Sequence, residues 1–280
     1  MQPKRVLTIQ DISCVGRCSL TVALPIISSA GIETSILPTA VLSTHTGDFV
    51  GYTYRDLTED IPGIVAHWKT LGLRFDAVYT GYLGSFEQLR LVSEIFDLFG
   101  HRDNLLIVDP AMADNGQLYA GFSQDFPQGM AALCTKADII VPNLTEAAFL
   151  LGETYRETYD QAYIEGLLAR LHALGCAKVV LTGVSFAPDQ LGAAVYDHGR
   201  IAFFFDKRIP GHFHGTGDVF ASAFTAAMLT LGSLEKAAEL AVTYTAASIR
   251  ATATEERERK YGVNFERCLP SLMRSLGLFD

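Results

Sequence analysis

One segment of the chain combines two glycines, a hydroxyl group and a carboxylate at the expected start of a helix. Residues 215–218 read Gly-Thr-Gly-Asp, and small and apolar residues follow them. Backbone N–H groups at such a start have no partner within the helix, so they form a site for an anion. Asp218 lies in the first turn, beside those donors. The alternative is an ordinary acidic residue that the helix dipole favours at this position.

Two further acidic side chains follow expected strands. Asp109 and Pro110 come directly after the apolar run 105–108, and Glu146 lies three residues after Asn143, which follows another such run. Two carboxylates at neighbouring strand ends can share a hydrated Mg²⁺ ion, which takes few protein ligands and several substrate oxygens. Alternatively, Asn143 caps a helix and Glu146 completes a capping box. Both interpretations remain open at this point.

Three common site motifs are missing from the chain. The segment after the first strand, residues 10–16, lacks G-x-G-x-x-G, which disfavours a dinucleotide site. Neither the phosphate-binding loop G-x-x-x-x-G-K-[ST] nor the hydrolase motif G-x-S-x-G occurs in the sequence. The candidate chemistry therefore lies with the carboxylates and the Gly-Thr-Gly-Asp segment.

The elements that must position these residues alternate along the chain. Apolar runs with strand character are separated by helical segments of about 10–20 residues, which is typical of a mainly parallel sheet with helices on both faces. Residues 197–199, Asp-His-Gly, form a hairpin turn signal and add an antiparallel edge late in the α/β chain. No linker interrupts the pattern, so we expect one domain over residues 1–280. The expected strands are 6–9, 34–37, 76–82, 105–108, 137–141, 178–181, 192–196 and 200–205, and the expected helices are 20–30, 55–71, 86–99, 145–151, 159–174, 217–231, 234–252 and 265–276.

The composition excludes several classes of protein. The 22 basic and 31 acidic side chains give a formal charge of −9, which argues against charge-driven binding to nucleic acid. No apolar run approaches the roughly 18 residues of a membrane span. Five dispersed cysteines indicate reduced thiols rather than disulfides, and Cys14 and Cys18 lack a second pair with zinc-ligand spacing. We therefore expect a cytoplasmic protein, and we expect the charge run 255–260 to be a solvated helix end.

Seven segments, taken in order, give the chain a resemblance to a known group of enzymes. The segment Gly81-Tyr82-Leu83-Gly84 matches a Gly-Tyr-x-Gly turn, and Asn143 and Glu146 match an Asn-x-x-Glu motif. On these residues the chain resembles the ribokinase-like superfamily and, within it, the pyridoxal (vitamin B6) kinases. The resemblance covers nearly the whole chain, and its segments are 6–10, 42–47, 80–84, 109–112, 114–122, 143–146 and 215–218.

The resemblance implies ATP-dependent phosphorylation of the 5′-hydroxymethyl group of a B6 vitamer. Asp218 would be the base that takes the hydroxyl proton, and the backbone amides of Gly215, Thr216 and Gly217 would stabilise the charge on the transferred phosphoryl group. The resemblance also implies Mg²⁺ held by Asp109 and Glu146, a small-molecule partner, and a homodimer.

The resemblance also assigns the remaining walls of the site. His45, Thr46 and Tyr82 would contact the pyridine ring, with Tyr82 and His45 each offering a flat face and one polar tip. A mobile lid over residues 112–122, including Asp114 and Tyr119, would close over the substrate from hinges at its glycines. Thr182, Val141, Asn143, the loop 207–210 and the segment 242–246 would line the nucleotide site.

Two departures from the family pattern bear on specificity. Asp11 stands where the family usually has serine, and the glycine-rich stretch after it is shortened. A carboxylate there favours a cation, either the protonated ring nitrogen of any vitamer or the aminomethyl group of pyridoxamine. The alternative is that Asp11 turns away and pairs with Arg17. Val141 stands where many members have threonine, so a hydroxyl contact to a monovalent cation or to the nucleotide is absent.

Two other functions compete with this interpretation. A hydroxymethylpyrimidine kinase of thiamine synthesis would share the fold and the Gly-Thr-Gly-Asp segment. The 81–84 turn and His45-Thr46-Gly47 favour the B6 substrate. A vitamer-binding protein without catalysis is the third possibility, and the intact Asp218, Asp109 and Glu146 argue against it.

Overall fold

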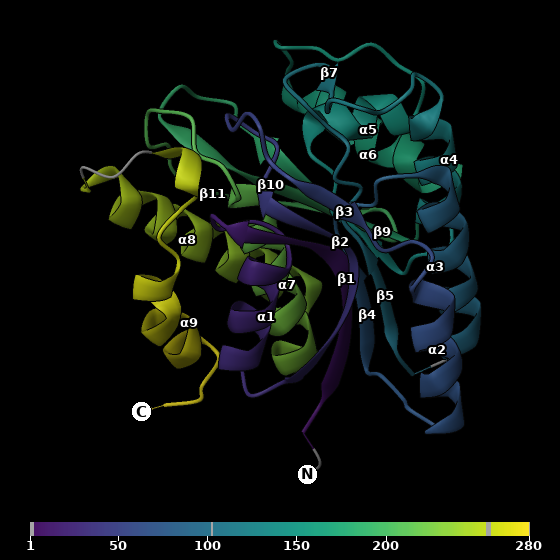
Figure 1. Ribbon diagram of the computed structural model, residues 1–280. Coiled ribbons are helices and arrows are strands. Elements are labelled where there is room, and N and C mark those ends of the chain that lie inside the picture. Colours follow the sequence, from purple (N-terminus) through teal and green to yellow (C-terminus); the bar gives the residue numbers. More distant parts are fainter. Residues whose placement is uncertain (1–2, 102, 256–258, 280) are drawn as a thin grey trace.

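A nine-stranded sheet runs through the whole computed structural model, which describes residues 3–101, 103–255 and 259–279. Its strand order is β11-β10-β9-β8-β5-β4-β1-β2-β3, and the central strands from β9 to β2 are parallel (Figure 1). The expected parallel sheet and the late antiparallel hairpin, β10–β11, are confirmed. The strands of the sheet are β1 (Arg5–Val15), β2 (Glu33–Thr44), β3 (Tyr54–Asp56), β4 (Ala77–Thr80), β5 (Leu105–Val108), β8 (Ile139–Ile140), β9 (Lys178–Val184), β10 (Gln190–Asp197) and β11 (Arg200–Lys207).

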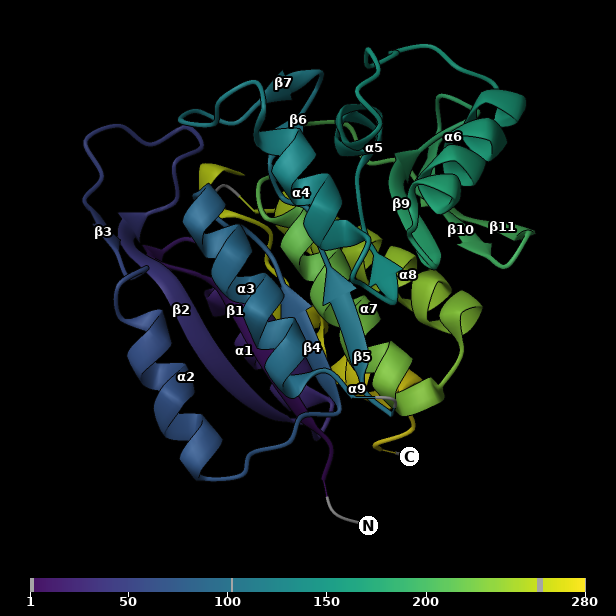
Figure 2. The ribbon, with the colours of Figure 1, turned by 90° about the vertical axis from the view of Figure 1, so that its right-hand side faces the viewer.

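Helices cover both faces of the sheet, so each face buries its own apolar core. One core lies under α2 to α6, and the other lies under α1, α7, α8 and α9 (Figures 1 and 2). Because the strands are buried on both faces, they read as continuous apolar runs rather than alternating ones. The helices are α1 (Leu20–Ser29), α2 (Ile61–Thr70), α3 (Phe86–Phe99), α4 (Phe126–Cys134), α5 (Leu144–Leu150), α6 (Gln161–Leu174), α7 (Thr216–Leu231), α8 (Leu234–Ala253) and α9 (Leu269–Ser275).

Local signals explain where several helices begin and end. Ser85 accepts a hydrogen bond from the N–H of Gln88 and begins α3, which ends before Gly100. Asp160 caps α6 in the same way, and Gly175, with a φ of 122°, ends it. These boundaries agree with the sequence pattern to within two residues.

Several elements differ from the sequence expectation. The helix expected over 55–71 begins only at Ile61, because residues 54–56 form β3 and pair with the edge of β2. Helix α4 was not expected, since proline and glycine interrupt its pattern; Gly129 is required there because a Cβ atom would lie 2.7 Å from the Phe86 ring. A two-stranded hairpin, β6 (Ala113–Asp114) and β7 (Gln117–Leu118), occupies the lid segment.

The expected last helix, 265–276, is divided into the short helix η2 (Glu266–Cys268) and α9. Of the charge run 255–260, expected to be a solvated helix end, positions 256–258 lie outside the described residues. Glu255 follows the end of α8, and Arg259 and Lys260 belong to the short helix η1 (Arg259–Tyr261). Among the helices of the described ranges, none combines the length and apolar character that crossing a bilayer requires.

Candidate active site

A cleft of about 590 Å³ lies where the parallel strands end, a volume suited to small ligands. Loops after β1, β4, β5 and β8 meet the start of α7 there, as expected for ligand sites of open α/β sheets. Every candidate residue identified from the sequence lines this one cleft. These residues are Asp11, His45, Thr46, Tyr82, Asp109, Asp114, Tyr119, Val141, Asn143, Glu146, Thr182, Gly215, Thr216, Gly217 and Asp218.

The start of α7 forms one wall of the cleft. Gly215 precedes the helix with a φ of 73°, a left-handed conformation that glycine adopts without strain. A Cβ atom at this position would lie 2.1 Å from the backbone oxygen of Arg17, so the two loops approach too closely for any side chain. The free N–H groups of the first turn therefore face the cleft, as an anion site requires.

Asp218 and Asp11 lie in the same part of the cleft and share one neighbour. The backbone N–H of Ser19 donates a hydrogen bond to the Asp218 carboxylate, and the Ser19 hydroxyl donates one to Asp11. Burial raises the pKa of Asp218 to about 7, and the negative charge of Asp11 adds to that effect. Ser19 has a φ of 52°, a strained conformation that is characteristic of functional sites. A carboxyl group with a pKa near neutrality is suited to proton transfer.

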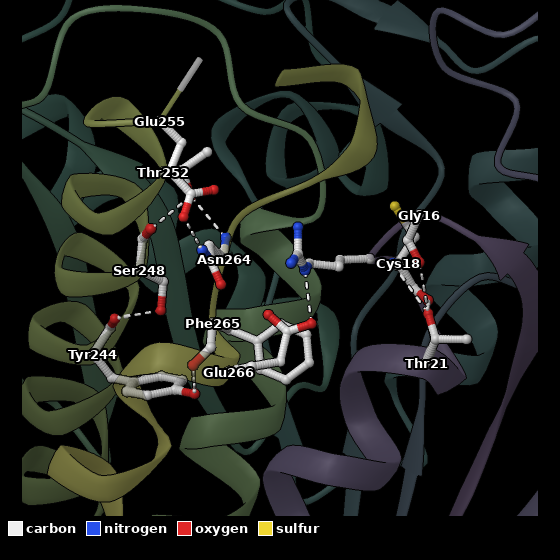
Figure 3. A network of polar contacts seen from close by, with 11 residues as sticks. Gly16, Cys18, Thr21, Tyr244, Ser248, Thr252, Glu255, Asn264, Phe265 and Glu266 are labelled. Carbon is white, nitrogen blue, oxygen red and sulfur yellow. Dashed lines mark hydrogen bonds and ion pairs between the residues drawn. The ribbon is translucent and has the colours of Figure 1, made fainter. Parts of the chain in front are cut away.

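Asp11 does not pair with Arg17, so the alternative raised from the sequence is wrong. The Arg17 Nε atom instead lies 2.7 Å from the carboxylate of Glu266, which is labelled in Figure 3. The Thr21 hydroxyl donates to the carbonyl oxygens of Gly16 and Cys18 and so closes the loop between β1 and α1. Asp11 is 5% exposed and accepts a hydrogen bond from the Ser13 hydroxyl at 3.1 Å. Burial raises its pKa, and hydrogen bonds from the Ser19 and Ser13 hydroxyls and the charge of His45 offset only part of this effect. Among the described residues, no lysine or arginine forms an ion pair with Asp11.

Asp109 and Glu146 are buried next to each other, and the structure distinguishes their surroundings. The capping box is present: Asn143 accepts from the Glu146 N–H, and Glu146 Oε2 accepts from the Asn143 N–H at 2.8 Å. Glu146 Oε1 accepts from the Met112 N–H at 3.1 Å. Within the described part of the chain, by contrast, the Asp109 carboxylate receives no hydrogen bond.

Burial and the Glu146 charge raise the pKa of Asp109. A carboxylate held at the cleft wall without a donor is suited to bind a divalent cation. The residues thus fit a Mg²⁺ ion with Asp109 as the main ligand. Glu146 retains free lone pairs, but it also completes the capping box of α5. The capping-box interpretation is therefore correct, and it leaves room for a contact with the ion.

The opposite end of the cleft is lined by rings. Both nitrogens of His45 have protein partners: Nδ1 accepts from the Gly47 N–H at 3.1 Å, and Nε2 lies 2.6 Å from the Lys260 carbonyl oxygen. His45 therefore has no free polar tip for a ligand, contrary to expectation. Tyr82 keeps its hydroxyl available, because burial raises its pKa to about 12 and the group stays protonated. Thr46 is exposed at the same rim.

The lid segment is held more firmly at its base than the sequence suggested. The β6–β7 hairpin hydrogen-bonds to α5, whereas a loop with little to anchor it was expected. Tyr119, which directly follows β7, is 40% exposed and lines the cleft. The base of the segment is thus a fixed support rather than a free hinge.

The remaining wall carries the residues expected around a nucleotide. Thr182 follows the buried part of β9 and binds the Pro142 carbonyl oxygen through its N–H at 2.9 Å. Val141 is buried beside it. Residues 207–209 of the expected loop 207–210 line the cleft, as do Val242, Thr245 and Ala246 of the expected segment 242–246. Ile249, one turn further along α8, also lines it and was not expected.

Comparison with known proteins decides the family. The model of the family described as phosphomethylpyrimidine kinase matches residues 64–263. The chain belongs to this kinase family. The pyridoxal kinase of Arabidopsis thaliana is 30% identical to it, over 92% of this chain and 85% of the relative.

Two solved structures share the architecture of this kinase closely. Pyridoxal kinase from Lactobacillus plantarum has 33% identity and a TM-score of 0.90, covering 97% of both chains. A protein from Bacteroides thetaiotaomicron, provisionally described as a phosphomethylpyrimidine kinase and crystallised with pyridoxal, has 38% identity and a TM-score of 0.92. It covers 97% of this chain and 96% of its own. The ribokinase-like fold expected from the sequence is thereby confirmed.

Sequence reasoning missed several residues of this kinase that line the cleft. Ser13 lies in β1 and Ser19 lies in the loop after it, and only a three-dimensional view shows that both reach Asp11. His214 precedes the Gly-Thr-Gly-Asp segment and lies 2.7 Å from Asp48, so it ties the loop after β2 to the start of α7. The adjacency of His214 to Gly215 was the one signal available in the sequence.

Proposed function

We propose that this enzyme transfers the terminal phosphoryl group of ATP to the 5′-hydroxymethyl group of a B6 vitamer. The observation that carries the proposal is the position of Asp218, beside the free amides of the α7 start in a cleft of suitable size. Pyridoxal kinases are among its relatives, and pyridoxal was crystallised with the Bacteroides protein. ATP is the phosphoryl donor of such kinases.

In this mechanism Asp218 accepts the proton of the vitamer hydroxyl group as that oxygen attacks phosphorus. A pKa of about 7 matches this task, because half of the groups are already deprotonated at that pH. The amides of Gly215, Thr216 and Gly217 receive the negative charge on the transferred group, and the helix dipole adds to their effect. Positioning and electrostatics supply most of the catalysis in phosphoryl transfer.

We further propose Asp109 as the main holder of Mg²⁺, with Glu146 contributing. The support is the buried Asp109 carboxylate, which receives no hydrogen bond from the described residues and lies near the charge of Glu146. Asp109 and Glu146 would hold the ion, which would supply positive charge toward the phosphates. Val141 has no hydroxyl group that could bind a monovalent cation. Activity measured across a K⁺ titration tests whether the enzyme uses such an ion.

The vitamer preference follows from Asp11 in this proposal. A buried carboxylate without a basic protein partner gains most from a cationic ligand. Arg17 is committed to Glu266, so the ligand itself would supply the positive charge. The aminomethyl group of pyridoxamine provides it, and pyridoxal has no equivalent. We propose pyridoxamine as the better substrate.

The description of the family model keeps hydroxymethylpyrimidine as a second candidate substrate. Turnover of pyridoxal, pyridoxamine and hydroxymethylpyrimidine, measured side by side with ATP, separates the two functions. We expect both vitamers to be phosphorylated with a higher kcat/KM than the pyrimidine. Faster turnover of the pyrimidine would reject the B6 assignment, and vitamer binding without ATP consumption would indicate a sensor.

Localisation and assembly complete the proposal. All five cysteines are free thiols, and two of them, Cys134 and Cys176, are buried; this supports a reducing, cytoplasmic environment. The family resemblance is the support for a homodimer. Sedimentation of the purified enzyme at several concentrations tests that assembly.

A further inference from the structure

Three side chains from one helical turn reach the same short segment of the lid. They belong to Asn143, Thr145 and Glu146, at the start of α5. Their partners all lie within residues 112–116, which comprise β6 and the Asn115-Gly116 turn of the β6–β7 hairpin and which we call the stem of the lid. The pairs are Glu146 Oε1 with the Met112 N–H at 3.1 Å, Asn143 Nδ2 with the Ala113 carbonyl oxygen at 2.8 Å, and Thr145 Oγ1 with the Gly116 N–H at 3.0 Å.

These contacts are buried and mutually braced. Thr145 is 2% exposed and Glu146 is 3% exposed, so water cannot readily replace a lost partner. The capping box fixes Asn143 and Glu146 to each other and to the helix start. At the far side of the stem, Gly116 lies against the ring of Tyr155, where a Cβ atom would be 3.0 Å from the ring. The stem therefore has one defined position on α5.

The segment after the hairpin has a different character. Residues 117–119 are still held, because β7 pairs with β6 and the Tyr119 N–H donates to the Met112 carbonyl oxygen at 2.8 Å. The Tyr119 side chain is 40% exposed and lines the cleft. Gly121 has a φ of 97°, and a Cβ atom there would meet nothing within 4 Å. Motion of the lid is therefore easier around Gly121 than within the hairpin.

We infer that the Asn143-Leu144-Thr145-Glu146 segment is a clamp for the lid, in addition to any role toward the nucleotide. Thr145 is the clearest member, because it does not line the cleft, while Asn143 and Glu146 do. Thr145 is a positioning residue that acts through the Gly116 N–H. Its hydroxyl holds the lid in a position from which Tyr119, which lines the cleft, can exclude water from the phosphoryl group.

The clamp predicts that loosening the stem separates ATP consumption from substrate phosphorylation. Thr145→Val keeps the shape of the side chain and removes the acceptor, and Thr145→Ser is the matched control because it keeps the hydroxyl. Loss of one such hydrogen bond corresponds to about threefold to tenfold in an equilibrium. In Thr145→Val we expect amide exchange of the 112–118 segment to accelerate by about that factor. We expect vitamer-independent ATP hydrolysis to rise relative to vitamer phosphorylation, with Thr145→Ser close to wild type.

An unchanged hydrolysis ratio in Thr145→Val, despite faster exchange at the stem, would overturn the clamp. Unchanged exchange would overturn it as well. If Thr145→Val does not fold, Gly116→Ala disturbs the same contact from the lid side, through its positive φ and the Tyr155 ring, and the same two measurements apply. The kinetic arm rests on the proposed function, and the exchange arm does not. A wild-type enzyme that phosphorylates no vitamer would reject the function and leave the clamp to the exchange data.

Discussion

The backbone oxygen of Arg17 lies where a side chain on Gly215 would have to be. The loop after β1 and the start of α7 are therefore pressed together, and this contact places Asp11 and Asp218 in one part of the cleft. A Cβ atom on Gly215 would lie 2.1 Å from that oxygen, and the backbone there has a φ of 73°. Both obstacles are intrinsic to the fold rather than to a bound ligand.

We expect Gly215→Ala to destabilise the enzyme, by about 2 kcal/mol or more, through steric overlap and the positive φ. Gly217→Ala is the matched control, because nothing lies within 4 Å of its Cβ position and alanine favours a helix. Thermal unfolding of both variants checks this. Equal melting temperatures would contradict the close contact.

Asp218→Asn should remove most of the turnover and leave ATP binding nearly intact. Asparagine keeps the shape of the side chain but cannot take the hydroxyl proton, and the loss of a general base typically costs roughly 10²–10⁴-fold in rate. Steady-state kinetics together with a nucleotide-binding titration tests this. A kcat near that of the wild type would remove Asp218 from the catalytic role.

The rate should depend on pH through the same residue. Burial raises the pKa of Asp218 to about 7, and only the deprotonated form acts as a base. We therefore expect kcat/KM to fall tenfold per pH unit well below 7 and to level off above it. The Asp11 charge contributes to the raised pKa, so Asp11→Asn should move this limb to lower pH. An unmoved limb would show that the two carboxylates are not coupled.

Asp11→Ser restores the residue usual in the family and should change the preference between vitamers. If Asp11 binds the aminomethyl group, the variant loses a charge-assisted hydrogen bond worth about 1.5–3 kcal/mol, or roughly 10–150-fold. The ratio of kcat/KM for pyridoxamine to that for pyridoxal should fall by such a factor. The ratio would stay constant if Asp11 faced the ring nitrogen, whatever happened to the absolute rates.

A divalent ion should be strictly required, and the two carboxylates should contribute unequally. We expect Asp109→Asn to raise the Mg²⁺ concentration for half-maximal rate more than Glu146→Gln does, because Glu146 already accepts backbone N–H groups. Activity measured across a Mg²⁺ titration, after treatment with a chelator, gives both values. An unchanged Mg²⁺ requirement in Glu146→Gln would show that Glu146 acts only in the capping box of α5 and in holding the lid.

The parallel sheet and the start of α7 could be predicted because local patterns determine them. Buried strands give continuous apolar runs. The glycines and the acidic residue of segment 215–218 indicate the start of a helix. The edge strand β3 was missed because its three residues are exposed and carry no apolar pattern. Helix α4 was missed because Gly129 serves a contact with Phe86 that is distant in the sequence.

The candidate residues were found, but their partners were not. The neighbours of Asp11 and His45 come from segments up to 215 residues away, and no spacing rule encodes them. The same holds for the double role of Glu146. Its capping box is visible in the sequence, whereas its contact with Met112 depends on how the lid folds back over α5.

Filling the cleft should change how many protons the enzyme carries. Burial raises the pKa of Asp11, Asp109 and Asp218, and for Asp218 it raises the pKa to about 7. The ligand-free enzyme therefore holds part of a proton on Asp218 near neutral pH, which an ordinary carboxylate would have lost. A cationic vitamer or a divalent ion lowers these pKa values and displaces the protons into the buffer. The heat of binding should therefore vary with the ionisation enthalpy of the buffer, and the slope of that dependence counts the protons released.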